Sequence, residues 1–99
     1  MSLARYDIFL LQGTRVLDVQ TDLIDQLQSR AVVPLLPVSE TPPSIRRLHP
    51  VFELDGEKLV MATQLIGAVP NTLFDEPIGN LSAHHDEIVA ALDMLFHGF

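Results

Sequence analysis

The chain closes with SAHHDEIVAALDMLFHGF, residues 82–99, and this stretch has the apolar spacing of an amphipathic helix. Ser82 is the expected N-cap, and Asp86 and Glu87 fall in the first turn, where carboxylates favour the positive end of the helix dipole. We therefore predict a helix over residues 82–99 that buries one face. The apolar residues of that face are Ile88, Leu92, Leu95 and Phe99, with Val89, Ala91 and Phe96 beside them.

The last turn of this predicted helix carries two aromatic rings. Phe96 and Phe99 flank His97-Gly98, and Asp93 lies one turn back on the polar side. Helix ends fray and offer apolar side chains little to pack against. Something must cover these rings, and the pattern alone does not decide whether they are buried by a partner or by the protein's own core.

Upstream of the helix, the pattern predicts an antiparallel sheet. Residues 6–11 and 15–19 form a hairpin around Gln12-Gly13-Thr14, and residues 49–54 and 58–63 form another around Asp55-Gly56, a strong type I′ signal. Residues 31–36 read as a strand that Pro34 restricts to an edge or a bulge. A last short strand is expected over residues 68–73, and the proline-rich residues 37–44 form a surface arm.

Residues 18–25 carry Asp18, Asp22 and Asp25 around Leu23-Ile24 and read as a loop. A calcium loop would need an interior glycine and a closing glutamate, which this stretch lacks. Caps and turns explain the three aspartates better, and core packing is the plainest role for Leu23-Ile24.

Composition limits the class of protein. The 99 residues are 47% hydrophobic, which indicates one folded domain over residues 1–99, and so much apolar surface on a short chain predicts a homodimer. The net charge is -7, and all six Lys and Arg lie at or before Lys58, so direct nucleic-acid binding is not expected. No signal peptide or membrane span is visible, and cysteine is absent, so we expect a cytoplasmic protein without membrane association.

Motifs of catalysis and cofactor binding are not found in the sequence. None of His49, His84, His85 and His97 stands four residues from another, so a metal site is not expected. Neither a nucleophile elbow nor a glycine-rich phosphate loop occurs, and we predict a protein without cofactor or catalytic residues. Arg46-Arg47 is the one basic doublet, and we interpret it as a solvated patch, with an anionic partner segment as the alternative.

Several blocks, in this order, resemble the CcdB family, the toxins of plasmid and chromosomal toxin-antitoxin pairs that poison DNA gyrase. An Asp-Val-Gln-x-Asp block followed by Val-Val-Pro-Leu and a terminal helix is far more specific than any single short motif. The blocks are Leu17 to Asp25, Arg30 to Leu35, Leu48-His49-Pro50-Val51, Ala68-Val69-Pro70 and Asn80 through Phe99.

The resemblance implies a mainly β fold with a C-terminal α-helix: an antiparallel SH3-like barrel of the CcdB/MazF type, with a small wing hairpin, paired into a homodimer. It implies a gyrase poison, not an enzyme, whose partners are the DNA gyrase A subunit and a CcdA-type antitoxin. The family's known ending is Trp-Gly-Ile, whereas this chain has His-Gly-Phe, with a smaller ring before the glycine. By position, the gyrase-binding residues implied are Leu23, Ile24, Asp93, Phe96, His97, Gly98 and Phe99.

Two alternatives stay open. A MazF-like endoribonuclease toxin would share the barrel but needs a cationic groove, and this chain has only Arg5, Arg15, Arg30, Arg46, Arg47 and Lys58 to build one. A non-toxic family member that only binds antitoxin is the other. Because like charges across an interface are penalised, the net charge of -7 predicts a weakly acidic or basic antitoxin segment.

Overall fold

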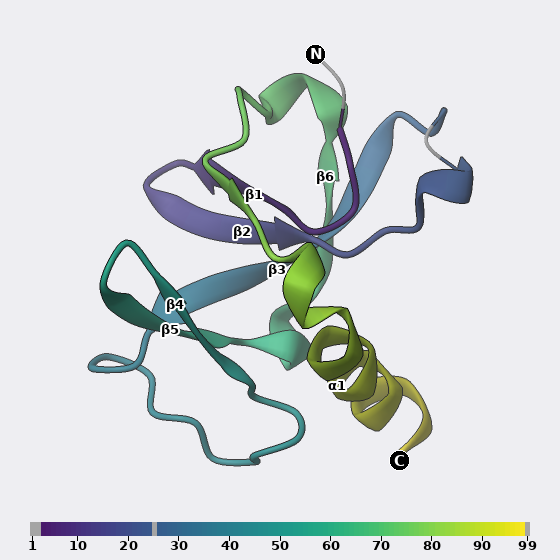
Figure 1. The fold of residues 1–99 in the computed structure, drawn as a ribbon. Helices are drawn as coiled ribbons and strands as arrows, with labels where there is room; N and C mark the ends of the chain where they lie inside the picture. The colour runs from purple at the N-terminus through teal and green to yellow at the C-terminus, as the bar shows by residue number, and fades with distance from the viewer. Residues whose placement is uncertain (1–2, 25, 99) are drawn as a thin grey trace.

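The structure is a computed structural model and describes residues 3–24 and 26–98. One strongly curved antiparallel sheet runs in the order β4-β5-β3-β2-β1-β7, with β6 also paired to β3, and α1 packs against it (Figure 1). The expected mainly β architecture with a C-terminal helix is confirmed. The strands are β1 (Asp7–Leu11), β2 (Thr14–Asp18), β3 (Ser29–Pro37), β4 (Val51–Leu54), β5 (Glu57–Met61), β6 (Gly67–Pro70) and β7 (Gly79–Asn80). The helices are α1 (His85–His97) and the 3-10 turns η1 (Asp22–Ile24), η2 (Thr63–Leu65), η3 (Asn71–Leu73) and η4 (Ser82–His84).

Both predicted hairpins are confirmed, and their turns show why. Gln12 and Gly13 have φ of 50° and 83°, and Asp55 and Gly56 have φ of 53° and 81°. Two successive residues with positive φ give the twist that matches two antiparallel strands, and only glycine and a few polar residues adopt it cheaply. Side chains along β4 alternate between the two faces of the sheet, because Phe52 is buried while Val51 and Glu53 are exposed.

The prediction that Pro34 restricts its strand to an edge or a bulge is wrong. β3 is central in the sheet: it pairs with β2 on one side and with β5 and β6 on the other. The carbonyl of Pro34 accepts a hydrogen bond from the N–H of Ala62 at 3.0 Å, so the nitrogen of Pro34 faces the same side. The residue opposite Pro34 on that side is Ala62, whose carbonyl accepts the N–H of Leu65 at 2.9 Å, so the N–H that proline lacks leaves no acceptor unpaired.

The approach to the helix also differs from the prediction. Ser82 opens η4 and caps nothing, and α1 begins at His85 behind His84, which makes no side-chain capping bond. The reason lies just before it, where the Asn80 side chain accepts the N–H of Ser82 at 2.8 Å and the N–H of Leu81 reaches Tyr6. These contacts hold β7 beside β1. β7 has two residues and is too short to show a sequence pattern, and the chain then enters α1 through the 3-10 turn η4.

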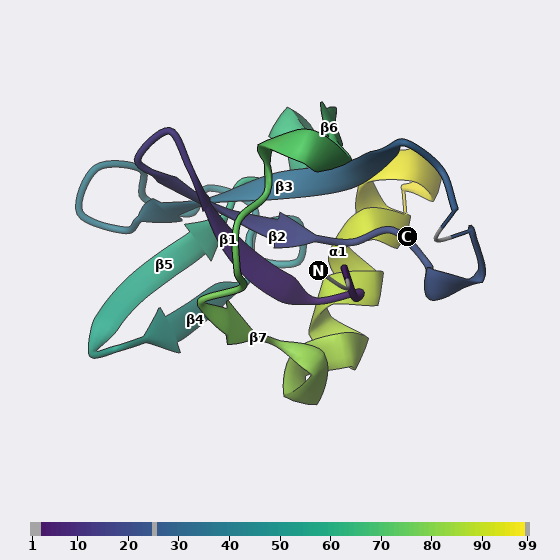
Figure 2. The same cartoon turned by 90° about the horizontal axis from the view of Figure 1, so that it is seen from above.

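The core lies between the concave face of the sheet and α1, as the view from above shows (Figure 2). Ile88 and Ala91 of the predicted apolar face are buried there, and Leu92 packs against them. A smaller cluster around Phe9 and Phe74 covers part of the other face of the sheet. Because the helix meets the core through its first half, its last turn extends beyond the packed region.

Tyr6 joins the start of β1 to the start of α1. Its hydroxyl bonds Nδ1 of His85, and the two rings meet edge to face with centroids 5.5 Å apart. Burial raises the pKa of Tyr6 above its ordinary 10.0; the nearby Arg5 guanidinium opposes this shift, and Asp22 and Asp86 add to it. The folded chain therefore keeps this phenol protonated at a pH where the unfolded chain has begun to lose the proton.

We expect the free energy of unfolding to fall as pH rises through about 10, because the folded state then binds more protons than the unfolded state. Tyr6 is the one tyrosine in the sequence, so the ultraviolet absorbance of the phenolate reports this group alone. The midpoint in native protein should lie above that in urea, and Tyr6→Phe should remove this part of the pH dependence. Equal midpoints in the two states would contradict the expectation.

Candidate binding surface

The C-terminal end of α1 presents its side chains outward. Phe96 is 62% exposed, and His97 and Gly98 are also exposed, whereas Asp93 is half-buried. Gly98 has φ of 79° and donates its N–H to the carbonyl of Met94 at 3.1 Å, a left-handed cap that turns the chain away from the helix axis. Phe99, also expected to contribute, lies outside the described residues.

The second element expected to contribute is η1. Leu23 is 88% exposed and Ile24 is 42% exposed, so neither is the core residue that the apolar pair on its own indicated. Exposure of an isobutyl side chain to water is unfavourable in free energy, and here the fold does not remove that cost by burying the side chain. Leu23 is therefore a candidate contact for a partner.

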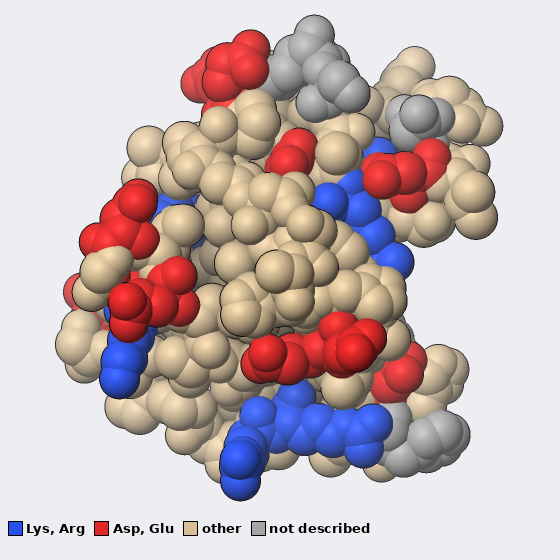
Figure 3. Space-filling view, viewed as in Figure 1, with Lys and Arg blue, Asp and Glu red and all other residues tan. Residues whose placement is uncertain are grey.

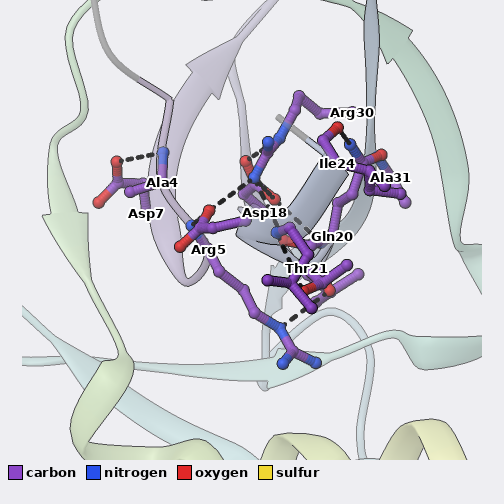
Figure 4. A network of polar contacts seen from close by, with 12 residues as sticks. Ala4, Arg5, Asp7, Asp18, Gln20, Thr21, Ile24, Arg30 and Ala31 are labelled. Atoms are coloured by element: carbon purple, nitrogen blue, oxygen red, sulfur yellow. Dashed lines mark hydrogen bonds and ion pairs between the residues drawn. The ribbon is translucent and has the colours of Figure 1, made fainter. Parts of the chain in front are cut away.

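A buried ion pair holds this turn to the sheet (Figure 4). Arg30 on β3 and Asp18 at the end of β2 are both fully buried, with Nε to Oδ2 at 2.8 Å and Nη2 to Oδ1 at 3.1 Å. The same Nη2 lies 3.2 Å from the carbonyl oxygen of Gln20 and 3.3 Å from Oδ1 of Asp22, the first residue of η1. That Asp22 oxygen also accepts the backbone N–H of Arg5 at 2.9 Å, so two segments of the chain position the turn.

The electrostatics of the pair reflect its burial. Removal from water raises the pKa of Asp18, while the Arg30 guanidinium and the N–H of Gln20 act in the opposite direction. The sequence prediction had assigned Asp18 to a cap or turn and counted Arg30 among the cations available for a phosphate groove. The assignment of Asp18 to a turn is confirmed, since its Oδ1 accepts the N–H of Gln20, two residues further on, at 3.0 Å. The assignment of Arg30 to a phosphate groove is wrong, because its guanidinium is buried against the carboxylate of Asp18 inside the sheet. The available signal was a charged residue beside apolar ones in each of two paired strands: Asp18 stands between Leu17 and Val19, and Arg30 stands before Ala31-Val32.

The two exposed elements lie on the same side of the molecule but do not touch within one protomer. In Figure 1, η1 is at the upper right and the end of α1 at the lower right, and the view from above also puts both on the right (Figure 2). The space-filling view shows an indented outline between them (Figure 3). A continuous surface that includes both elements would have to span this indentation.

Within residues 3–24 and 26–98, no group of three or more His, Cys, Asp or Glu is arranged to hold a metal ion. None of the helices described has the length and apolarity needed to cross a membrane. The described surface features that could bind a partner are the exposed apolar residues Leu23, Ile24 and Phe96 and the charged residues around them.

Comparison with known proteins gives two findings. The family described as "CcdB protein" matches residues 5–98. Among solved structures, one described as "Endoribonuclease in complex with its cognate antitoxin from Mycobacterial species" is similar, with a TM-score of 0.77 and 16% sequence identity. The similarity covers 94% of this chain and 93% of that one, and at this identity it is a likeness of fold.

Proposed function

The chain belongs to the CcdB family, and from that membership we propose that it is a toxin that binds the DNA gyrase A subunit and is neutralised by a CcdA-type antitoxin. The observation that carries the proposal is the exposure of Phe96 at the end of α1, the position that the family resemblance assigns to gyrase contact. Leu23 and Ile24 on η1 support it, because they are exposed apolar residues that the fold does not use.

The proposed action is differential binding rather than catalysis. If the helix ends fit only the gyrase conformer that opens around cleaved DNA, binding stabilises that conformer relative to the resealed one. To move an equilibrium from almost entirely one state to almost entirely the other, a ligand must prefer it by about 10⁴-fold. A contact surface available only in the opened enzyme supplies such a preference, and the cleaved complex accumulates in the cytoplasm.

Two copies of the chain are part of the proposal. In one protomer the exposed Phe96 on α1 and Leu23 on η1 are separate from each other. A homodimer presents the end of α1 and η1 twice, and so offers more apolar area to a symmetric target. The half-buried Leu95 and Met94 near the exposed ring are candidates for burial between copies.

The endoribonuclease alternative is less well supported by the positions of the cations. Arg30 is buried against Asp18, Arg15 pairs with Glu57 at 2.8 Å, and the Nε of Arg5 donates to the carbonyl of Val19. A groove that holds RNA needs cations free to meet phosphates and to stabilise developing charge. These three arginines are already engaged and serve that purpose poorly, which leaves only Arg46, Arg47 and Lys58 exposed for it.

A cleavage-complex assay tests the proposal. Purified gyrase, supercoiled plasmid and ATP are incubated with the full chain, and protein is then removed with denaturant and protease. We expect linear DNA to accumulate in proportion to the toxin, and prior addition of the antitoxin to prevent it. RNA fragments without DNA breaks would favour the endoribonuclease, and antitoxin binding without either activity would indicate the non-toxic family member.

A further inference from the structure

Arg5 lies between η1 and α1, on the side where the outline of the molecule is indented. Its backbone N–H donates to Oδ1 of Asp22, the first residue of η1, at 2.9 Å. Its guanidinium lies over the ring of Tyr6, 4.8 Å from the centroid, and the Tyr6 hydroxyl bonds His85, the first residue of α1. Figure 3 shows basic atoms at the upper margin of the indentation, beside η1. Arg5 therefore connects the two elements of the proposed gyrase-binding surface.

The Arg5 guanidinium is held at one nitrogen and open at the other two. Its Nε donates to the carbonyl of Val19 at 3.1 Å, and Figure 4 shows its side chain directed away from the pair of Asp18 and Arg30. Neither terminal nitrogen has a hydrogen-bond partner among the described residues, and neither is buried from solvent. No carboxylate in the same part of the chain lies within 4.0 Å of the guanidinium. Two N–H-bearing nitrogens of a half-buried cation are thus left for a partner.

A guanidinium held in this way is suited to bind a carboxylate. The N–H groups of its terminal nitrogens lie in one plane, and their spacing matches the two oxygens of a carboxylate. The contacts with Tyr6 and Val19 fix the side chain before a partner arrives, which lowers the ordering cost of binding. A partner that covers Leu23 and Phe96 also removes water from the indentation, and opposite charges attract more strongly away from water.

The surroundings of Arg5 favour a single carboxylate over a nucleic acid. RNA carries its charge along a backbone and needs several free cations in a row, whereas Arg30, the other arginine near η1, is fully buried. Besides burial, Asp22 on η1 and Asp86 on α1 raise the pKa of Tyr6, the residue beneath the Arg5 guanidinium. A polyanion would therefore meet negative charge on both sides of Arg5. One acidic side chain on an otherwise apolar protein surface meets only the cation.

We propose that Arg5 is a specificity-determining residue of the gyrase-binding surface and that its two terminal nitrogens bind a carboxylate of the DNA gyrase A subunit. This inference rests on the proposed function and adds a contact outside the residues that the family resemblance implies, which lie on η1 and in the second half of α1. The indentation then receives an acidic projection of the target, with η1 on one side and the end of α1 on the other. A target with a basic residue at that place is disfavoured by repulsion.

The test is a titration of purified gyrase A subunit with the full chain at low and high salt, with and without DNA. Arg5→Gln removes the charge, so binding should weaken on the order of tenfold, and affinity should depend less on salt. Arg5→Lys keeps the charge but not the planar fork, and should recover only part of the loss. Lys58→Gln is the matched control, since it makes the same change in net charge at an exposed cation on β5 and should bind as wild type.

Two further measurements separate this contact from a purely structural role. The urea midpoint shows whether each variant keeps its fold, while the salt dependence of binding reports the charge contact itself. The phenolate absorbance of Tyr6 reports where the guanidinium lies. Because the Arg5 charge lowers the pKa of Tyr6, Arg5→Gln should move the absorbance midpoint upward and Lys58→Gln should not. An unchanged midpoint in Arg5→Gln would place the guanidinium away from Tyr6 and overturn the proposed geometry.

Wild-type affinity and salt dependence in Arg5→Gln, or an equal loss in Lys58→Gln, would overturn the Arg5 contact and leave gyrase as the target. A loss in Arg5→Gln that occurs only when DNA is present would also overturn it, since the bound anion would then be a DNA phosphate. A wild-type chain that does not bind gyrase would reject the proposed function together with this contact. The failure of the contact and the failure of the proposed function can therefore be told apart.

Discussion

Removal of Gly98 and Phe99 is expected to abolish gyrase trapping while the fold and the homodimer persist. Gly98 is exposed and bonds only the carbonyl of Met94 among the described backbone contacts, so its loss frays the last turn of α1 and little else. Burial of one aromatic ring in a target is worth about 1.5–3 kcal/mol, or about tenfold to a hundredfold in affinity. Loss of the left-handed cap also misdirects the neighbouring Phe96, and the combined effect should exceed either loss alone.

The measurement is the yield of linear DNA across a concentration series of the truncated chain. Phe96→Ala, which removes a ring that is 62% exposed, should lower the yield partially and leave the urea midpoint almost unchanged. Leu73→Ala is the matched control, since Leu73 is 52% exposed on η3, at the opposite end of the molecule from the C-terminus (Figure 1). Equal trapping by the truncated and full chains would show that gyrase is contacted elsewhere.

Asp18→Ala should lower the free energy of unfolding by about 3–5 kcal/mol, as much as truncation of a large core side chain. The substitution leaves the Arg30 guanidinium in the interior without its carboxylate, and a buried unpaired charge costs far more than a lost surface contact. Since small domains are stable by about 5–15 kcal/mol, this loss is a large fraction of the total. The η1 turn should loosen as well, because Arg30 also binds Gln20 and Asp22.

Urea unfolding followed by circular dichroism measures this change. Asp22→Ala is the control, because its carboxylate is 58% exposed and contacts the same Arg30, and it should cost about 1 kcal/mol or less. The double variant Asp18→Leu with Arg30→Met should recover most of the loss, since it removes both charges together. A single Asp18→Ala variant that unfolds within about 1 kcal/mol of wild type would disprove the role of the pair.

The position of the exposed surface was partly predictable. An aromatic residue in the last turn of an amphipathic helix indicated that Phe96 needed cover, and the structure leaves it exposed. The family resemblance pointed to Leu23-Ile24, whereas the pattern alone favoured the core for that pair. Their exposure depends on how η1 is tied to Arg30, a residue that the sequence pattern did not connect with Asp18.

By itself, the sequence determined the two hairpins, the apolar face of α1 and the acidic first turn of that helix. These features follow from neighbouring residues, because positive φ at Gly13 and Gly56 and the helical repeat around Ile88 are local constraints. Only the tertiary structure decided that Pro34 lies in a central strand, that Asp18 and Arg30 form a buried ion pair, and that residues 43–51 and α1 line a groove. Each of these depends on segments far apart in the chain meeting in space, where burial and pairing outweigh what any one residue prefers alone.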